Sequence, residues 1–302
     1  MVYLFIPLLF FFITSAGISQ PYVLPQVETV KLKPYAHLKQ PALTETSGIV
    51  KSRRFPEVFW AHNDSGDWQR IFAVSRLGYT IKPDWAEDYQ GIRIPDAVAV
   101  DWEDIAIDNQ GRLYIGDIGN NFSIRRDLAI YILNEPDPRN TVTTSVLKRI
   151  LFYYPEQKEF PDSMNNFDAE AMFCRENTIY ILTKHRGDTQ THLYSLENPD
   201  PVEENAARLL ETIDIGGMVT GADISPDGNM LAVITTRAVW VFEFQPETGR
   251  FFGGNAWWLP IFAKQCEAIC FDGKRLILAN EQGELFELFL SRLLPLKKQE
   301  SP

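Results

Sequence analysis

Five oxygen-bearing side chains recur along this chain, each at the start of a similar short phrase. The phrase is a polar residue followed by a small or acidic residue and then an apolar run, as in Glu103-Asp104-Ile105-Ala106. Steps of 56, 67, 50 and 47 residues separate the five. Three are carboxylates and two are hydroxyls: Glu103, Glu170, Glu267, Ser47 and Thr220. If each opens the innermost strand of one unit in a circular array, the five oxygens form a ring around one axis.

A ring of this composition suits a hard divalent cation. Three converging carboxylates would repel one another strongly at low dielectric, and a bound cation removes that cost. Calcium accepts about 6–8 oxygen ligands at about 2.3–2.6 Å in loose geometry, whereas magnesium requires a strict octahedron. No histidine occupies these positions, which disfavours zinc. We therefore expect Ca2+ as the cofactor. The alternative is that the five side chains cap strands around a water-filled channel.

Basic side chains occur in the loops that should surround this ring. Each such loop follows the second strand of a unit, so it lies on the same face as the start of the first strand. Lys184, Arg186 and Arg237 are basic residues in an acidic protein, and they could hold a phosphate, sulfate or carboxylate group. Asn121 lies in an equivalent loop. We expect these four residues to bind a small polar or anionic ligand at the channel mouth.

The same loops contain candidates for acid–base chemistry. Asp64, Asp117 or Glu281 could act as a base or orient a water molecule, and His62 could shuttle a proton. The alternative is that these residues are the ordinary polar composition of turns. The sequence has no GxSxG, HExxH or P-loop motif that would assign a reaction.

Short apolar strands must position these residues. The second strands are expected at 58–63, 113–118, 178–184, 230–236 and 276–281. The third strands are expected at 70–75, 128–133, 192–196, 238–244 and 284–290. Fourth strands are expected in four repeats, at 91–100, 148–155, 208–215 and 256–262. Turn sequences such as Pro226-Asp227-Gly228 separate the first and second strands.

The fifth repeat ends without an outer strand, which the segment 27–38 can supply. This closure predicts an all-β, five-bladed β-propeller whose ring is closed by the N-terminal strand. The alternative is a β-sandwich or two small β domains. A helical turn is expected within 201–210.

The ends of the chain and its composition limit where it acts. The apolar run near the start predicts a signal peptide over 1–19, followed by one propeller over 20–295 and a frayed tail over 296–302. The alternative is that the apolar run is retained as an N-terminal anchor. We expect a secreted or periplasmic monomer with no membrane span after signal removal. The 40 acidic residues against 29 basic ones argue against a nucleic-acid partner. Cys174, Cys266 and Cys270 are expected as free buried thiols.

Two resemblances add to this interpretation. The strings SGIV…FWAHNDSGDWQRIFAV, DWEDIAID…LYIGDIGNN, DAEAMF…IYILTK and VTGADISPDG resemble a family of exported bacterial β-propeller proteins of unassigned function. That resemblance covers nearly the whole mature chain and implies the fold and export.

The residues that open the five repeats are also similar to those of the calcium-activated nucleotidases, the five-bladed secreted apyrases. In that family these positions ring a calcium on the propeller axis. The resemblance therefore implies calcium ligands at Ser47, Glu103, Glu170, Thr220 and Glu267, where Thr220 replaces a serine and keeps the hydroxyl. The phrase Asp64-Ser65-Gly66 is loosely similar to the family's acidic first loop. The family's longer basic nucleotide-binding insertions have no match here.

Three functions fit these observations. The first is a binding or scaffold module in which calcium is structural. The second is a calcium-dependent hydrolase that acts on phosphoanhydrides or phosphoesters. The third is a glycosidase that uses two carboxylates of the mouth at a defined separation.

Overall fold

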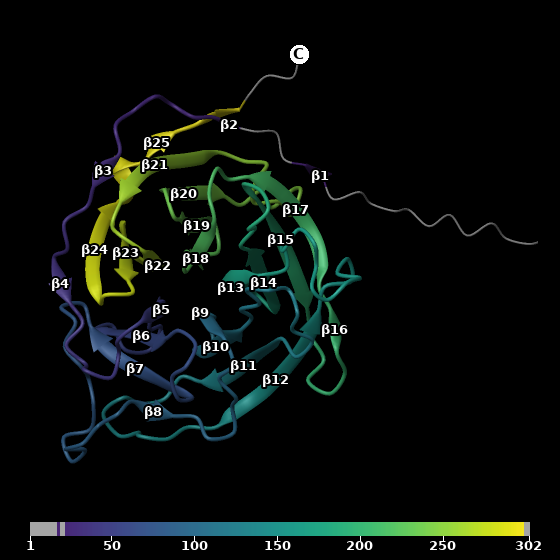
Figure 1. The fold of residues 1–302 in the computed structure, drawn as a ribbon. Helices are drawn as coiled ribbons and strands as arrows, with labels where there is room; N and C mark the ends of the chain where they lie inside the picture. Colours follow the sequence, from purple (N-terminus) through teal and green to yellow (C-terminus); the bar gives the residue numbers. More distant parts are fainter. Residues whose placement is uncertain (1–16, 19–21, 299–302) are drawn as a thin grey trace, which may run out of the picture.

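The computed structural model describes residues 17–18 and 22–298, which form five small β-sheets arranged in a ring (Figure 1). The first strand of each sheet lies nearest the axis and the later strands follow outward. This arrangement confirms the all-β, five-bladed β-propeller. The expected signal peptide over 1–19 lies outside the described residues, apart from 17–18. Among the described residues, no helix is long and apolar enough to cross a membrane.

Each blade contains three strands of regular length and one outer strand. The inner strands are β5 (Thr46–Lys51), β9 (Trp102–Ile107), β13 (Ala169–Arg175), β18 (Val219–Ile224) and β22 (Cys266–Asp272). The second strands are β6 (Val58–Asn63), β10 (Arg112–Asp117), β14 (Thr178–Thr183), β19 (Met230–Thr235) and β23 (Arg275–Asn280). The third strands are β7 (Arg70–Ser75), β11 (Ala129–Asn134), β15 (Gln190–Glu197), β20 (Ala238–Glu243) and β24 (Glu284–Phe289).

The outer strands are less regular. They are β8 (Ile92–Arg93), β12 (Val146–Tyr153), β17 (Arg208–Asp214), β21 (Ala256–Phe262) and β4 (Ala36–His37). Short additions extend the outer edges: β1 (Gly17–Ile18) on β17, β16 (Asn205–Ala206) on β12, and both β3 (Val30–Lys31) and β25 (Leu294–Pro295) on β21. A 3-10 turn, η1 (Leu290–Arg292), follows β24.

The N-terminal segment closes the ring, as expected, but it does so in two pieces. β4 pairs antiparallel with β24 and completes the fifth blade. β3 instead pairs in parallel with β21 of the fourth blade. Pro34 lies between the two pieces and has no backbone N–H to continue a ladder. The segment 27–38 therefore spans the boundary between two blades.

Three local expectations are corrected by the structure. The fourth strand expected over 91–100 is reduced to β8, because Pro95 interrupts it and the residues beyond form turns. The helical turn expected within 201–210 is absent there, since β16 and β17 pair with β12 and β15. In the tail over 296–302, β26 (Lys297–Lys298) pairs with β2 (Tyr22–Val23), and 299–302 lie outside the described residues.

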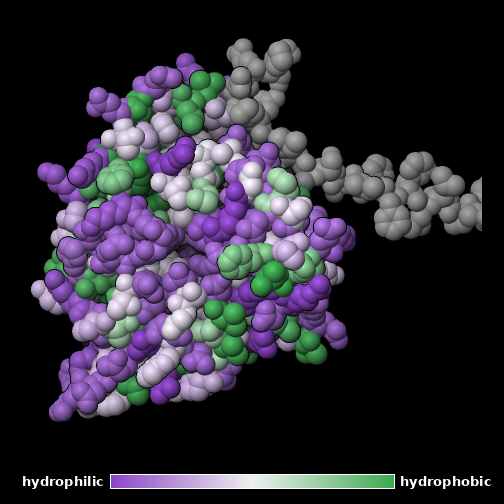
Figure 2. Space-filling view, viewed as in Figure 1, coloured by the Kyte–Doolittle hydropathy of each residue, from purple (hydrophilic) through white to green (hydrophobic). Residues whose placement is uncertain are grey.

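Apolar side chains pack between neighbouring blades, which buries the inner and second strands almost completely. All six residues of β6 are buried, and Trp60, Trp102 and Tyr131 are among the largest buried side chains. One core cluster contains residues of the first, second and fifth blades. It therefore packs the fifth blade, which β4 completes, against the first blade. The face seen in Figure 2 is mostly hydrophilic, with small separate hydrophobic groups.

Removing the N-terminal segment should break the closure of the ring. Deletion of residues 1–40 removes β4 and leaves the outer edge of β24 unpaired, which favours edge-to-edge association. We expect aggregation and a lower melting temperature, measured by light scattering and calorimetry. Deletion of residues 1–21 is the matched control, because it keeps β3 and β4. A soluble 1–40 deletion that melts like the control would contradict this account of closure.

Candidate metal centre at the channel mouth

All five residues of the predicted ring lie at a β-bulge in the inner strand of their blade. In β5, Thr46 pairs with Asn63 and Gly48 pairs with His62, so no residue of β6 lies opposite Ser47. The same shift in register leaves out the corresponding residue of the other four inner strands, which are Glu103, Glu170, Thr220 and Glu267. A bulge re-aims the extra residue's side chain and occurs often beside functional sites. The five side chains therefore share one local geometry.

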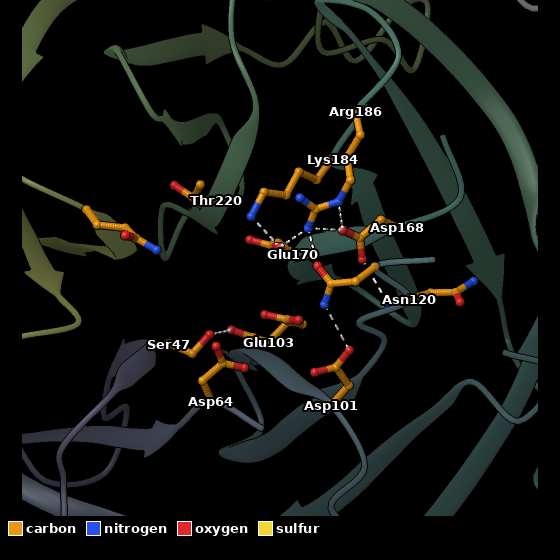
Figure 3. Close-up of polar contacts among 12 residues, drawn as sticks. Ser47, Asp64, Asp101, Glu103, Asn120, Asp168, Glu170, Lys184, Arg186 and Thr220 are labelled. Atoms are coloured by element: carbon orange, nitrogen blue, oxygen red, sulfur yellow. Dashed lines mark hydrogen bonds and ion pairs between the residues drawn. The ribbon is translucent and has the colours of Figure 1, made fainter. Parts of the chain in front are cut away.

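The structure brings three carboxylates close together on one side of this ring. Oxygen atoms of Asp64, Asp101 and Glu103 all lie within 4.8 Å of one another (Figure 3). Asp64 belongs to the loop after β6, and Asp101 immediately precedes β9. Gly119 gives the carboxylates room, because a Cβ atom there would lie 2.3 Å from Oε1 of Glu103 and 2.4 Å from Oδ2 of Asp101. We call these three residues the acidic triad.

Glu103 is the member of the triad that most needs a partner. Glu103 is only 4 % exposed, and among the described residues no donor or cation pairs with its carboxylate. Burial raises the pKa of this carboxyl group well above its usual range, and repulsion from Glu170 and Asp64 adds to the effect. Burial also raises the pKa of Asp101 to about 6, and Asp64 contributes. A divalent cation would relieve this unfavourable burial of charge.

On the other side of the ring, basic side chains pair with two of the carboxylates. The Lys184 ammonium forms an ion pair with Glu170, and the Arg186 guanidinium lies 3.5 Å from the same carboxylate (Figure 3). Arg186 also donates from Nε and Nη2 to Asp168 at 3.0 and 2.8 Å. Asp168 is fully buried and accepts the backbone N–H of Asn120 at 2.7 Å. Lys184 and Arg186 therefore supply positive charge to the ring.

The carboxylates on this side nevertheless titrate at unusually high pH. Burial raises the pKa of Glu170 to about 8, although Lys184 acts in the opposite direction. Burial raises the pKa of Glu267 to about 7. Glu170 and Glu267 in turn raise the pKa of Lys184 against the effect of its own burial. The mouth thus holds more buried acidic groups than its basic side chains neutralise.

The two hydroxyls of the ring have structural partners. Ser47 Oγ donates to the carbonyl oxygen of Glu103 at 2.6 Å, and Thr220 Oγ1 donates to that of Cys266 at 2.8 Å. Each bond joins the inner strand of one blade to that of the next or previous blade in the ring. The oxygen lone pairs of Ser47 and Thr220 stay available to a cation, while the hydroxyl protons are used in hydrogen bonds between blades.

Two further carboxylates lie on the inner strands beyond the ring residues. Asp104 is 1 % exposed and accepts the backbone N–H groups of Ile105 at 2.8 Å, Met172 at 2.7 Å and Ala222 at 3.4 Å. Asp223 is 3 % exposed and accepts the N–H of Phe271 at 2.8 Å. These bonds connect the inner strands of the second, third, fourth and fifth blades.

The structure gives Asp117 a structural position. It ends β10 in the place that Asn63, Thr183, Thr235 and Asn280 occupy in the other blades, and all five are buried. Its Oδ1 accepts the N–H of Asp101 at 2.9 Å and pairs with Arg125 at 3.0 Å. The equivalent side chains also bond to loop backbone, as Asn280 does with Glu284. Asp117 therefore organises the loop.

The remaining expected site residues have different surroundings. His62 is fully buried, and its ring lies edge-on to Trp102 at 5.8 Å. Glu281 is half-buried and accepts a hydrogen bond from Gln265. Arg237 is exposed in the turn after β19 and lines a separate cavity with Trp258.

Asn121 is the expected ligand residue that does lie beside the triad. Its Oδ1 accepts a hydrogen bond from Arg186, and its Nδ2 lies 3.4 Å from Oδ2 of Asp101. Asn121 therefore bridges the acidic and the neutralised sides of the mouth.

Asp101 and Asp168 were not among the residues that the sequence analysis singled out. Both lie two residues before a ring glutamate, in the phrases Asp101-Trp102-Glu103 and Asp168-Ala169-Glu170. This Asp-x-Glu spacing occurs at both repeats and could have identified them. The other three repeats have Glu45, Met218 and Gln265 at the same place, which obscures the pattern.

A cavity of about 430 Å3 lies at the opposite end of the inner strands. Hairpin turns between the first and second strands line it, including Arg53, Asp108, Arg175 and Asp227. It is therefore separate from the acidic triad, which lies where the inner strands begin.

Comparisons with known proteins do not assign the chain to a family or to a function. No family model matches the chain, and no curated protein matches it. One similar solved structure is that of the computationally designed Ika8 protein, in its first crystal packing in P63. The two share 9 % identity over 81 % of this chain and 70 % of that chain, with a TM-score of 0.35. A likeness of this size carries no argument about function.

The structural role of Asp117 can be separated from a catalytic one. Asp117→Asn removes the buried partner of Arg125 and should lower the free energy of unfolding by about 1–3 kcal/mol. The matched control is Asp127→Asn, because Asp127 pairs with the same Arg125 but its side chain is 57 % exposed. Denaturant unfolding measures both. An Asp117→Asn protein as stable as the control would exclude the structural role.

The raised pKa values of Glu170 and Glu267 predict how stability depends on pH. Both values lie above the usual carboxyl value of about 4.3, so the folded state binds extra protons between those limits. Their contribution is complete below about pH 4 and is lost as pH rises through about 7 and 8. We expect the melting temperature of the metal-free protein to fall between about pH 4.5 and 8 and to level off at higher pH. Replacing both residues with glutamine should flatten this slope, and a flat slope in the unaltered protein would refute the idea.

Proposed function

We propose that the protein is an exported calcium-binding propeller whose mouth binds a small polar or anionic ligand. It works as a monomeric binding or scaffold module in the secreted or periplasmic space. The observation that carries this proposal is the buried Glu103 side chain, whose carboxylate lies beside Asp64 and Asp101 and has no partner among the described residues. A hard cation with flexible oxygen coordination is the partner that this set of donors suits best.

Two sets of ligands are compatible with this proposal, and both contain Glu103. One is the five-fold ring expected from the sequence. The other is the acidic triad, which is displaced from the ring towards the first and second blades. The triad is the better candidate, because Lys184 already neutralises Glu170 and because the triad's oxygens lie within 4.8 Å of one another.

The ligand site would lie between the cation and Arg186. Three carboxylates leave several of the about 6–8 coordination positions of calcium free for water or for a ligand's oxygen. The side chain of Arg186 is 30 % exposed, and its Nη1 has no partner among the described residues. A carboxylate, phosphate or sulfate group bound to the cation could accept hydrogen bonds from this guanidinium. Asn121 would contribute an amide beside it.

The same geometry favours a calcium-dependent hydrolase as the second candidate. Carboxyl groups with raised pKa values beside cationic side chains are frequent in active sites. Phosphoanhydrides and phosphoesters are the substrates that a cation and Arg186 would suit. Turnover of these substrates with calcium, compared with turnover in EGTA, separates the hydrolase from the binding module.

Calcium should stabilise the folded protein. A ligand that binds only the folded state adds about 2.7 kcal/mol at 100 times its dissociation constant. We expect the melting temperature to rise on adding CaCl2 and to fall again in EGTA. Glu103→Gln should abolish most of this rise, whereas exposed Glu247→Gln is the matched control. If the unaltered protein shows no thermal shift and retains no calcium by elemental analysis, the metal centre does not exist.

The two sets of ligands give different variant patterns. If the triad binds calcium, Asp64→Asn and Asp101→Asn should weaken binding more than Glu170→Gln and Glu267→Gln. If the five-fold ring binds it, the order is reversed. Titration calorimetry with calcium measures each affinity.

A further inference from the structure

Two histidines form a buried pair behind the basic loop of the mouth. His185 lies in the loop between β14 and β15, and His192 lies on β15. Their ring centroids are 4.4 Å apart and their planes are nearly perpendicular, at 82°. His185 is only 2 % exposed, and His192 is half-buried. This pair is separate from the acidic triad and has different donor chemistry, with nitrogen in place of oxygen.

One nitrogen of each ring lacks a partner. Among the described residues, no hydrogen bond reaches His185 Nε2 or His192 Nδ1, although both atoms are buried. Buried polar atoms are normally hydrogen-bonded, because an unmet donor or acceptor is costly. One metal ion bonded to both of these atoms would satisfy them together.

The lone pair of His185 Nε2 is fixed by its neighbours. Nδ1 of His185 lies 2.7 Å from Oδ1 of Asp188, and only a protonated Nδ1 can donate to that carboxylate. Asp188 is itself held by the N–H of Gln190 at 2.8 Å and the amide of Asn166 at 3.0 Å. Nε2 of the neutral ring is then unprotonated. A carboxylate behind a histidine in this way is typical of metal-binding imidazoles.

Both rings are neutral at physiological pH. Burial lowers the pKa of His185, and burial together with His185 lowers the pKa of His192 to about 4. A neutral imidazole is the form that binds a metal.

The spacing of the rings fits a metal with ligands at right angles. A nitrogen bound at about 2.0–2.1 Å places the ring centroid about 3.2 Å from the metal. Two such rings at a right angle have centroids about 4.5 Å apart, and at the tetrahedral angle about 5.2 Å. The observed centroid distance of 4.4 Å is compatible with the right angle, which square-planar Cu2+ and Ni2+ prefer.

We propose that His185 Nε2 and His192 Nδ1 bind one divalent transition-metal ion, Cu2+ or Ni2+, at a site independent of the calcium centre. Because Lys184 and Arg186 flank His185 in the chain, the metal would also fix the loop that delivers both cations to the mouth.

The test is copper binding by the full chain without a polyhistidine tag. After treatment with EDTA and dialysis, Cu2+ is titrated in the presence of excess Ca2+. We expect one bound Cu2+ with an EPR spectrum that shows two imidazole nitrogens. The chain has four histidines. His185→Gln and His192→Gln should each weaken binding about tenfold or more, whereas exposed His37→Gln is the control and should not.

Three results would overturn the proposal. They are the absence of bound copper, equal affinity in the two variants and the control, and displacement of copper by Ca2+, which would place it at the carboxylates. If circular dichroism shows that a variant is unfolded, the EPR spectrum of the unaltered protein decides. Two coordinated nitrogens support the site, and one or none refutes it.

Discussion

Negative charge buried on the axis is the constraint on which the inner strands, the mouth and its loops all depend. The buried carboxyl groups have three kinds of surroundings. Asp104 accepts backbone N–H groups of three inner strands, so its carboxyl group holds blades together. Glu170 is satisfied by the side chain of Lys184. Glu103 has no partner among the described residues. Its carboxylate is therefore available to bind an added cation.

Most of the fold could be predicted from the sequence, because strand length and turn residues are local properties. The five opening phrases located the inner strands, and the structure places each opening residue at a bulge. The irregular outer edge could not be predicted as well. Which blade a short edge strand joins depends on contacts distant in sequence, as for β3, which joins β21 while β4 joins β24.

The site was predicted less completely, for a physical reason. Spacing along a strand shows how deep a residue lies, but it does not show which neighbour neutralises it. Lys184 and Arg186 were expected to face a ligand, and the structure shows that they also pair with Glu170 and Asp168, at the start of the adjoining inner strand. Asp117 was expected to be reactive, yet Arg125 engages it. Asp101 was missed because its place in the acidic triad depends on its proximity to Asp64, which belongs to another blade.

The join between β4 and β24 brings the two ends of the chain into one sheet. During synthesis the N-terminal segment leaves the ribosome first, and its partner strand leaves last. The residues of β4 must therefore stay unpaired until nearly the whole chain has been made. Closing so long a loop is among the slower events in folding. The nascent chain thus carries an open strand edge through translation and any passage across a membrane, and a chaperone that binds extended segments would find its target there.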